Sequence, residues 1–318
     1  MKYYIGIDLG GTNIAVGIVE DTGRLITKHS EPTHAEKTFE ELVSDIAKAA
    51  YEAVRISGLT SEDIFAVGMG TPSCINPRTG LLVNANNLNW INVPLLEEMK
   101  KHFSMPVYIQ NDAACAALGE AISGAAADYE DVLLVTLGTG VGGGIILNKK
   151  VFNGCDSMGA EIGHTKLVYD GIPCTCGQRG CFESYASATA LIRQTKEAMK
   201  NHPESILHSL CDKDESKVNA KMLFDAAQLG DKVAMKVLDT YIDYLAAGLS
   251  SLIAVFRPQA VIIGGGVSGA GEALMNPLRE KLFANTFAAE QIGLPHLDAA
   301  RLGNDAGIIG AAMLCCER

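Results

Sequence analysis

The chain has 318 residues, of which 48% are hydrophobic and 20% charged, and its formal net charge is −11. This composition predicts a packed protein of about two domains rather than a disordered chain. The acidic balance argues against nucleic acid or an anionic membrane surface as a partner, because both require a basic surface. The sequence shows no secretory signal and no apolar run of about 18 residues, so we expect a cytoplasmic protein that does not span a membrane.

Two segments of the chain share one pattern of strand, glycine turn and strand. The first, IDLGGTNIAVGIV, covers residues 7–19 and is followed by a short apolar run at 24–30. The second, VTLGTGVGGGIIL, covers residues 135–147 and is followed by a similar run at 149–155. Two halves that each open with three strands predict a duplicated α/β fold with a cleft between the halves.

Helix and strand alternate through the rest of the first half. Apolar residues at helical spacing predict a helix over residues 39–57. A buried strand that ends in a loop is expected at residues 64–72. The other elements predicted in this half are helices at 93–103 and 113–122 and a strand at 106–110.

The second half of the chain is richer in helix. The polar stretch at residues 201–217 is expected to be a surface loop. Helices are predicted from Glu183 to about Lys200, from about Ala220 to Phe256, from Gly271 to about Phe283 and near Ala306–Leu314, with one strand at 260–266.

The first glycine turn, DLGGTN, leads into a β-branched segment that predicts a second strand. A dinucleotide-binding unit would need a helix there, so we disfavour that interpretation. The backbone at Gly10 and Gly11 can still approach a phosphate closely, and Thr12 and Asn13 offer further donors. Asp8, just before the turn, is well placed to hold Mg²⁺ through water.

Two further glycine turns occur in the second half. LGTGVGGG, at residues 137–144, would hold the same phosphate chain, and GGGVS, at 264–268, follows a strand where a nucleoside could rest. The alternative is that each segment is merely a tight turn. Because the three turns lie at corresponding points of a two-fold repeat, nucleotide binding is the favoured interpretation.

Asn111 and Asp112 lie between a predicted strand and a predicted helix. Asp is a favoured helix cap, and the local sequence alone favours that role for Asp112. The alternative is a general base, since an Asp at a strand end could accept the proton of a substrate hydroxyl that attacks a γ-phosphate. Asn111 would then hold a neighbouring hydroxyl.

One histidine and three cysteines lie close together in the sequence: His164, Cys174, Cys176 and Cys181. In a reducing compartment such a cluster more often binds a metal than forms disulfides. The donor set is that of a structural zinc site, and four protein ligands leave no position for a catalytic water. The remaining cysteines are expected to be small buried or surface thiols: Cys74, Cys115, Cys155, Cys211, Cys315 and Cys316.

Two acidic residues flank this cluster. An ion bound by both His164 and Cys181 would bring Glu161 and Glu183 together. Rigidly held carboxylates are good acceptors for sugar hydroxyls, so we expect the metal to brace a hydroxyl-binding site. The alternative is that both are solvated surface acids.

Taken together, these motifs resemble the ROK family of sugar kinases, within the class that shares the actin and hexokinase fold. The resemblance runs over nearly the whole chain. It implies a two-lobed, duplicated actin-like/hexokinase (ribonuclease H-like) ATPase fold with a zinc-binding insertion in the second lobe. The first lobe would comprise residues 1–112 and a C-terminal helix at about 303–318, and the second residues 113–302. The motifs that carry it are DLGGTN (8–13), QND (110–112), LGTGVGGGI (137–145), AEIGH (160–164), CTCGQRGCFESYAS (174–187) and IIGGG (262–266).

The resemblance implies ATP-dependent phosphorylation of a hexose, with glucose as the first choice and glucose 6-phosphate as the product. Asp112 becomes the general base, which reverses the local preference for a cap. The cofactors implied are ATP, Mg²⁺ and a structural Zn²⁺, and a homodimer is expected. Sugar contacts fall on Asn87, Asn111, Glu161, His164 and Glu183; phosphate contacts on the turns Gly10–Asn13 and Gly138, Thr139 and Gly140; nucleoside contacts on Gly265 and Gly266.

One loop departs from the family pattern. Ser73 and Asn76 stand where relatives usually have a glycine and an aspartate, and this loop lies near the sugar. The alternatives are therefore a kinase for N-acetylmannosamine, N-acetylglucosamine or fructose. From other classes, a non-catalytic sugar sensor and a chaperone-like ATPase are disfavoured by the intact glycine turns and by the cysteine-anchored sugar site. The family's repressors carry an N-terminal helix-turn-helix domain, which we do not expect here because the first predicted strand begins within a few residues of Met1.

Overall fold

The computed structural model describes residues 1–73 and 75–316 of the chain, so Cys74 lies outside the described residues. The chain forms two compact units. The first comprises Met1–Leu134, Gly144–Ala160 and the C-terminal segment from Ala300, and the second comprises Val135–Gly143 and Glu161–Ala299. Among the described residues, no helix combines the length and the hydropathy that a membrane-spanning helix needs.

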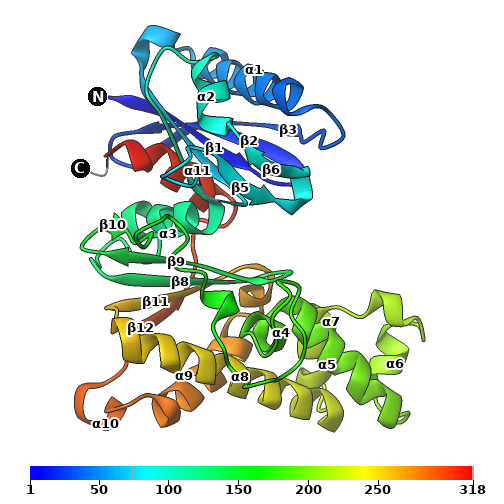
Figure 1. Ribbon diagram of the computed structural model, residues 1–318. Coiled ribbons are helices and arrows are strands. Elements are labelled where there is room, and N and C mark those ends of the chain that lie inside the picture. Colours follow the sequence, from blue (N-terminus) through cyan, green and yellow to red (C-terminus); the bar gives the residue numbers. More distant parts are fainter. Residues whose placement is uncertain (74, 317–318) are drawn as a thin grey trace. The chain divides into compact units, whose positions relative to one another are not determined.

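The first five-stranded sheet has the strand order β3-β2-β1-β4-β7 (Figure 1). Strand β1 pairs with β2 in an antiparallel manner, as β2 does with β3, whereas β1 with β4 and β4 with β7 are parallel. The carboxyl ends of β1, β4 and β7 therefore meet at one edge. The bounds are β1 (Tyr3–Leu9), β2 (Asn13–Glu20), β3 (Leu25–Pro32), β4 (Ile64–Thr71) and β7 (Val107–Asn111).

The second five-stranded sheet repeats this order as β10-β9-β8-β11-β12. Each sheet opens with three strands consecutive in sequence and adds two later ones on the side of its first strand, so the predicted duplicated α/β fold is confirmed. Strand β12 was not predicted, nor was the separate hairpin of β5 (Leu82–Ala85) and β6 (Trp90–Val93). The bounds are β8 (Val132–Leu137), β9 (Val141–Leu147), β10 (Lys150–Val151), β11 (Ala260–Gly264) and β12 (His296–Ala299).

Helix α1 (Phe39–Ser57) covers one face of the first sheet and has the predicted bounds. Thr38 caps its N-terminus in a capping box with Glu41, and Gly58 ends it with a left-handed backbone at φ 76°. Its apolar face packs with strand residues and with Trp90 into one buried cluster. The shorter helix α2 (Leu95–Lys100) lies within the predicted range 93–103.

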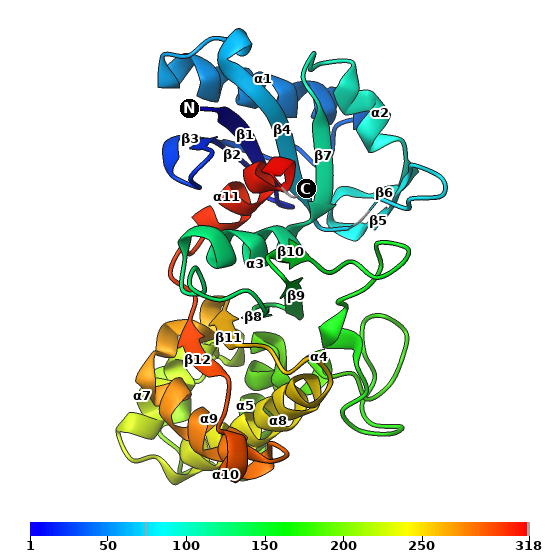
Figure 2. The ribbon, with the colours of Figure 1, turned by 90° about the vertical axis from the view of Figure 1, so that its left-hand side faces the viewer.

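Helix α11 (Asp305–Met313) lies between the first sheet and helix α3 (Asp112–Ser123), as Figure 2 shows. Glycines make this packing possible. A Cβ atom at Gly68 of β4 would lie 1.7 Å from the Ala311 carbonyl oxygen, and one at Gly310 of α11 would lie 1.6 Å from the Cys115 carbonyl oxygen. Backbone therefore contacts backbone on both sides of α11, which fixes the place of α3 against the sheet.

Besides a short helix at Ala289–Ile292 that was not predicted, the second unit differs from prediction in three places. The predicted helix from Glu183 to Lys200 is interrupted at Ser187. The Ser187 side chain accepts from the Ala190 N–H and caps the N-terminus of a new helix. The predicted helix from Ala220 to Phe256 is interrupted at Gly230, where φ is +86°, and Asp231 caps the helix that follows. These helices are α4 (Glu183–Ala186), α5 (Ala188–Asn201), α7 (Ala220–Gln228), α8 (Lys232–Phe256), α9 (Glu272–Asn285) and α10 (Ala289–Ile292).

The third difference concerns residues 201–217, which were expected to form a surface loop. This segment contains helix α6 (Leu207–Leu210), and Leu207 and Cys211 are fully buried. The surface-loop prediction is therefore wrong for the middle of the segment, because a few apolar side chains in a polar stretch suffice to anchor it to the core.

Candidate functional site

Two carboxylates of the first unit flank a glycine at the carboxyl edge of the first sheet. Asp8 near the end of β1 pairs in register with Gly70 of β4. A Cβ atom at Gly70 would lie 3.5 Å from the Cα of Asp112, the first residue of α3. The parallel order of β1, β4 and β7 thus brings Asp8 and Asp112 together, although about a hundred residues separate them in the chain.

Asn111, not Asp112, caps helix α3. The Asn111 Oδ1 atom accepts hydrogen bonds from the Ala113 N–H at 2.9 Å and the Ala114 N–H at 3.1 Å. The cap that the local sequence favoured at Asp112 is therefore one residue earlier. Asp112 occupies the first helical position and accepts from the Ala113 N–H at 2.7 Å through one oxygen. The amide group of Asn111 keeps two N–H donors for other partners.

The pKa of Asp8 is well above its ordinary value of 3.8. Burial raises it, the negative charge of Asp112 raises it further, and the Lys28 ammonium group opposes both, giving a pKa of about 6. Lys28 itself pairs with Asp305 at the start of α11. Without a cation, burial and the Asp112 charge make ionisation of Asp8 unfavourable. A cation bound beside Asp8 would stabilise the ionised carboxylate and offset this free-energy cost.

The raised pKa predicts a pH-dependent loss of stability. The folded protein keeps the Asp8 proton up to about pH 6, whereas the unfolded chain releases it near pH 3.8, so stability falls as pH rises through this window. Asp8→Asn is therefore expected to raise the free energy of unfolding at pH 7.5 by up to about 3 kcal/mol. Urea unfolding without Mg²⁺ at pH 4 and pH 7.5 measures this, and the gain should disappear at pH 4.

A control with the opposite sign comes from Asp45, whose pKa is lowered by hydrogen bonds from Lys37 and Lys48. Asp45→Asn should lose stability at pH 7.5 and lose little at acidic pH, where the wild-type carboxyl is protonated as well. An Asp8→Asn variant that is no more stable than wild type at pH 7.5 would contradict the burial argument.

The first glycine turn is held by its own backbone and by Thr33. The Gly10 N–H donates to the Asn13 carbonyl oxygen at 2.9 Å, and the Thr33 N–H donates to the Thr12 carbonyl oxygen at 2.8 Å. Gly11 lies against Asn87, because a Cβ atom at Gly11 would come 3.0 Å from the Asn87 Cβ. Asn87, predicted to contact the sugar, thus lies beside the turn predicted to hold phosphate.

The second glycine turn, in the second unit, is held from α5. The Ala188 N–H donates to the Gly138 carbonyl oxygen at 2.8 Å, and the Thr189 hydroxyl donates to the Thr139 carbonyl oxygen at 2.7 Å. A Cβ atom at Gly138 would meet nothing within 4 Å. Ser187 is a favoured N-cap residue, so the sequence could have predicted a helix that begins at Ala188 beside this turn. The prediction of one unbroken helix from Glu183 to Lys200 missed it.

The third glycine turn adjoins the second. Gly265 has φ of +81°, and a Cβ atom there would lie 2.5 Å from the Leu137 carbonyl oxygen at the end of β8. Gly266 has open space where a side chain would be. Two of the three turns therefore offer backbone without side chains next to each other, the arrangement that a bound nucleotide needs.

The predicted metal ligands come together in the second unit. The ligand atoms of His164, Cys174, Cys176 and Cys181 all lie within 4.8 Å of one another. The His164 Nδ1 atom is 3.8 Å from the Cys174 Sγ, and the Cys176 and Cys181 Sγ atoms are 3.7 Å apart. A tetrahedron with Zn–S bonds of about 2.3 Å has edges of about 3.8 Å, so the donor set and its spacing fit zinc.

The thiols of this cluster influence one another. Burial raises the pKa of Cys174, but hydrogen bonds from the backbone and side chain of Cys176 and from other neighbours lower it to about 7. Burial and the neighbouring thiols raise the pKa of Cys181 to about 11. The Lys166 ammonium group donates to the Cys181 Sγ at 3.7 Å. Because metal ligands must be thiolates, metal affinity should fall at acidic pH.

Glu183 and the short turn that follows Glu161 both lie against Val141, the first residue of β9. Glu161 is exposed and precedes the short turn Ile162–His164, in which a Cβ atom at Gly163 would lie 2.1 Å from the Val141 carbonyl oxygen. The Glu183 Oε2 atom accepts from the Val141 N–H at 3.0 Å. The predicted site residues thus form two groups, with Asp8, Asn87, Asn111 and Asp112 in the first unit and Glu161, His164 and Glu183 in the second.

The loop that departs from the family pattern uses its polar side chains locally. The Ser73 hydroxyl accepts from the Asn84 N–H at 3.2 Å, and the Asn76 Oδ1 accepts from the Arg78 N–H at 2.9 Å. Both residues lie in the first unit. Ser73 therefore connects this loop to strand β5 of the β5–β6 hairpin, which carries Asn87 between its two strands.

Comparison with known proteins identifies the relatives of this chain. The family model described as ROK family matches residues 4–318. A glucokinase of Thermotoga maritima is 39% identical over 315 residues, which cover 99% of this chain and 97% of that protein. A glucokinase of Streptomyces coelicolor is 36% identical over 319 residues, with 100% and 98% covered. Among solved structures, a ROK family glucokinase from Streptomyces griseus in complex with glucose and AMPPNP is 37% identical, with a TM-score of 0.79 and 98% of each chain covered.

Proposed function

The chain belongs to the ROK family and is an ATP-dependent sugar kinase, and we propose that it phosphorylates glucose to glucose 6-phosphate. The glucokinases to which it is similar support glucose as the substrate. The structure of the Streptomyces griseus relative, with glucose and AMPPNP bound, supports the pairing of these two ligands. Kinases for N-acetylmannosamine, N-acetylglucosamine or fructose are the alternatives that Ser73 and Asn76 leave open.

The observation that carries the proposal is the pair of carboxylates on either side of Gly70. Asp112 would accept the proton of the sugar 6-hydroxyl as its oxygen attacks the γ-phosphorus. Asn111 caps helix α3, and Asp112 lies one residue later, beside Gly70 at the carboxyl edge of the first sheet. Asp8 would hold Mg²⁺ through water, and the metal would supply charge neutralisation on the phosphates.

The remaining ligand contacts follow the predicted groups. The turns at Gly10–Asn13 and Gly138–Gly140 would hold the phosphates, and Gly265 and Gly266 the nucleoside. The predicted lobe boundaries and the homodimer remain predictions. The proposed sugar contacts are Asn87, Asn111, Glu161, His164 and Glu183.

We assign the zinc a structural role. His164 and the three cysteines would complete its coordination and leave no position for a reacting water. The four ligands lie on the segment that precedes α4, so the metal would hold the loop next to Glu161 and Glu183. It would supply no chemistry to phosphoryl transfer.

A coupled assay of ADP formation with a panel of hexoses tests the substrate. Glucose is expected to give the highest kcat/KM at saturating Mg-ATP, with mannose, fructose, N-acetylglucosamine and N-acetylmannosamine lower. A higher value for an N-acetylhexosamine would replace glucose by that substrate. ADP formation that no sugar increases would overturn the kinase proposal and favour a sensor or a chaperone-like ATPase.

Metal analysis tests the zinc assignment. We expect about one zinc per chain in the purified protein. Cys181→Ser, at a fully buried ligand, should lose the metal, whereas Cys155→Ser, at an exposed thiol outside the cluster, should retain it. Fully active wild-type protein that contains no zinc would contradict the assignment.

A further inference from the structure

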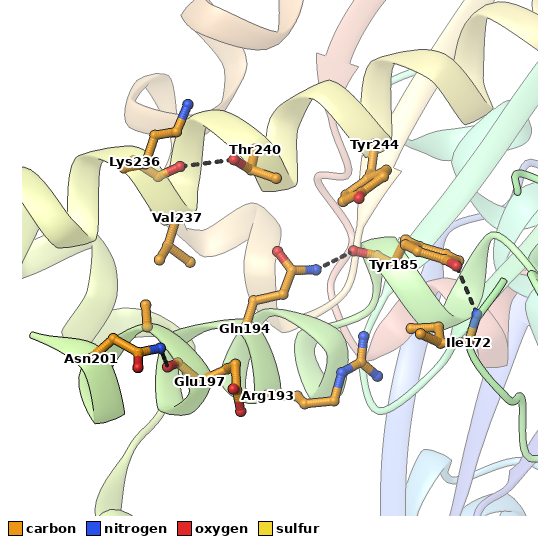
Figure 3. Close-up of a pocket in the computed structure, with 11 residues that line it drawn as sticks. Ile172, Tyr185, Arg193, Gln194, Glu197, Asn201, Lys236, Val237, Thr240 and Tyr244 are labelled. Atoms are coloured by element: carbon orange, nitrogen blue, oxygen red, sulfur yellow. Dashed lines mark hydrogen bonds between the residues drawn. The ribbon is translucent and has the colours of Figure 1, made fainter.

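The short helix α4, which begins with Glu183, is held by side chains of α5 and α8. A one-turn helix leaves its last carbonyl groups, here those of Ser184, Tyr185 and Ala186, for partners outside the helix. These carbonyl groups accept hydrogen bonds from Arg193 at 2.5 Å, Gln194 at 2.9 Å and Tyr241 at 2.7 Å. The Tyr185 hydroxyl of α4 also accepts at 2.9 Å from the Ile172 N–H, which belongs to the zinc loop, the segment between His164 and Glu183 that carries the three cysteine ligands. Figure 3 shows the Gln194 and Tyr185 contacts at the wall of a pocket of about 550 Å³ between α5 and α8.

The Glu183 carboxylate connects two features that the sequence placed far apart. Its Oε2 atom accepts from the Val141 N–H at 3.0 Å, directly after the second glycine turn. Its Oε1 atom accepts from the Thr175 hydroxyl at 3.2 Å and lies 3.7 Å from the Cys174 Sγ. One oxygen therefore contacts the phosphate-binding turn and the other contacts the zinc loop.

Gly140 leaves no room between this carboxylate and the turn. A Cβ atom at Gly140 would lie 2.1 Å from Oε2, so only glycine allows the backbone to approach Glu183 this closely. The opposite side of the same turn is held by Ala188 and Thr189, which donate to the carbonyl oxygens of Gly138 and Thr139. The position of the turn thus depends on residues 183–189 as a unit.

We propose that Glu183 is a positioning residue that transmits the geometry of the metal site to the phosphate-binding turn. The inference rests on the proposed function, because it assumes that residues 138–140 contact the phosphates of ATP. Metal binding holds Cys174 and Thr175, Thr175 orients the carboxylate, and the carboxylate fixes the Val141 N–H at the end of the turn. Loss of the metal should therefore weaken nucleotide binding as well as sugar binding.

The substitutions Glu183→Gln and Glu183→Ala separate the effect of the two hydrogen bonds from the effect of the negative charge. Gln can accept from the Val141 N–H with its carbonyl oxygen and donate to Thr175 with its amide. Glu183→Ala removes both contacts. We expect Glu183→Ala to weaken the binding of Mg-AMPPNP about tenfold or more and Glu183→Gln to stay within about threefold of wild type, as measured by calorimetry on zinc-loaded protein.

Matched controls come from an acid outside the proposed sites and from the metal. Glu290→Ala, which removes an exposed carboxylate of the second unit that contacts none of the proposed ligands, should leave AMPPNP affinity unchanged. Removing zinc from wild type with a chelator should weaken AMPPNP binding, but should add little in Glu183→Ala, because both changes break the same connection. If Glu183→Ala does not fold, Thr175→Val, which removes only the hydroxyl, should still weaken binding while the melting temperature stays near that of wild type.

The outcomes distinguish this inference from the function on which it rests. A Glu183→Ala protein that binds AMPPNP as tightly as wild type would overturn the inference. Equal losses in the Ala and Gln variants would also overturn it, because the charge and not the hydrogen bonds would then matter. Wild-type protein that binds no AMPPNP would instead refute the proposed kinase function, and the inference with it.

Discussion

Replacing Asp112 with asparagine is expected to lower kcat by a factor of about 10² to 10⁴, the usual contribution of a general base. Asparagine has nearly the same shape, and its Oδ1 can still accept from the Ala113 N–H, so helix α3 should begin as before. Steady-state kinetics with glucose and Mg-ATP measure the loss. The KM for each substrate should change little, because the interaction that is removed belongs to the transition state.

A second readout of Asp112→Asn reports on the neighbouring carboxyl. The charge of Asp112 contributes to the raised pKa of Asp8, so the variant should shift the pKa of Asp8 downward. NMR titration of the metal-free protein, or the pH dependence of its stability, would detect this shift. A variant that keeps most of its turnover would contradict the base assignment, and an unchanged Asp8 pKa would contradict the geometry.

Replacing Gly310 with alanine is expected to destabilise the first unit by about 3 kcal/mol or more, or to prevent accumulation of folded protein. The added Cβ would lie 1.6 Å from the Cys115 carbonyl oxygen, and backbone at such a contact cannot move aside as a side chain can. Helix α11 would have to shift relative to α3. Because α3 begins at Asp112, any protein that folds should also lose turnover. Urea unfolding followed by circular dichroism measures the stability.

Gly269→Ala is the matched control, because a Cβ atom there meets nothing within 4 Å and its backbone is not left-handed. We expect its free energy of unfolding to stay within about 0.5 kcal/mol of wild type. A Gly310→Ala protein as stable as this control would show that α11 and α3 do not pack as closely as described.

Features that depend on neighbours in the chain were predicted well. The strands around both glycine turns and the bounds of α1 follow from local periodicity, capping residues and glycines, all of which act over a few positions. The ligand cluster was also predicted, because His164 and the three cysteines lie on one short segment. Its tetrahedral spacing then agreed with the donor types.

The strand and the helix breaks that were missed carry little local pattern of their own. Strand β12 (His296–Ala299) is a strand only because it pairs with β11, and four residues carry too little pattern to reveal that. The breaks at Ser187 and Gly230 lie within apolar patterns that continue on both sides, so periodicity alone extended each helix across its break. At both breaks a capping residue is present, Ser187 in the first and Asp231 in the second, but the continuing apolar pattern was given more weight.

The sequence by itself determined the family, the strands on either side of the first two glycine turns, and the residue types available to bind a metal, to bind phosphate and to accept a proton. Only the tertiary structure decided which of them meet: that Asn111 and not Asp112 caps α3, that Asp8 lies beside Asp112, and that Glu183 reaches both Thr175 and Val141. The physical reason is the distance along the chain over which each effect acts. Propensity and spacing act over a few residues, whereas these contacts join distant segments that only the sheet order and the backbone packing at glycines bring together.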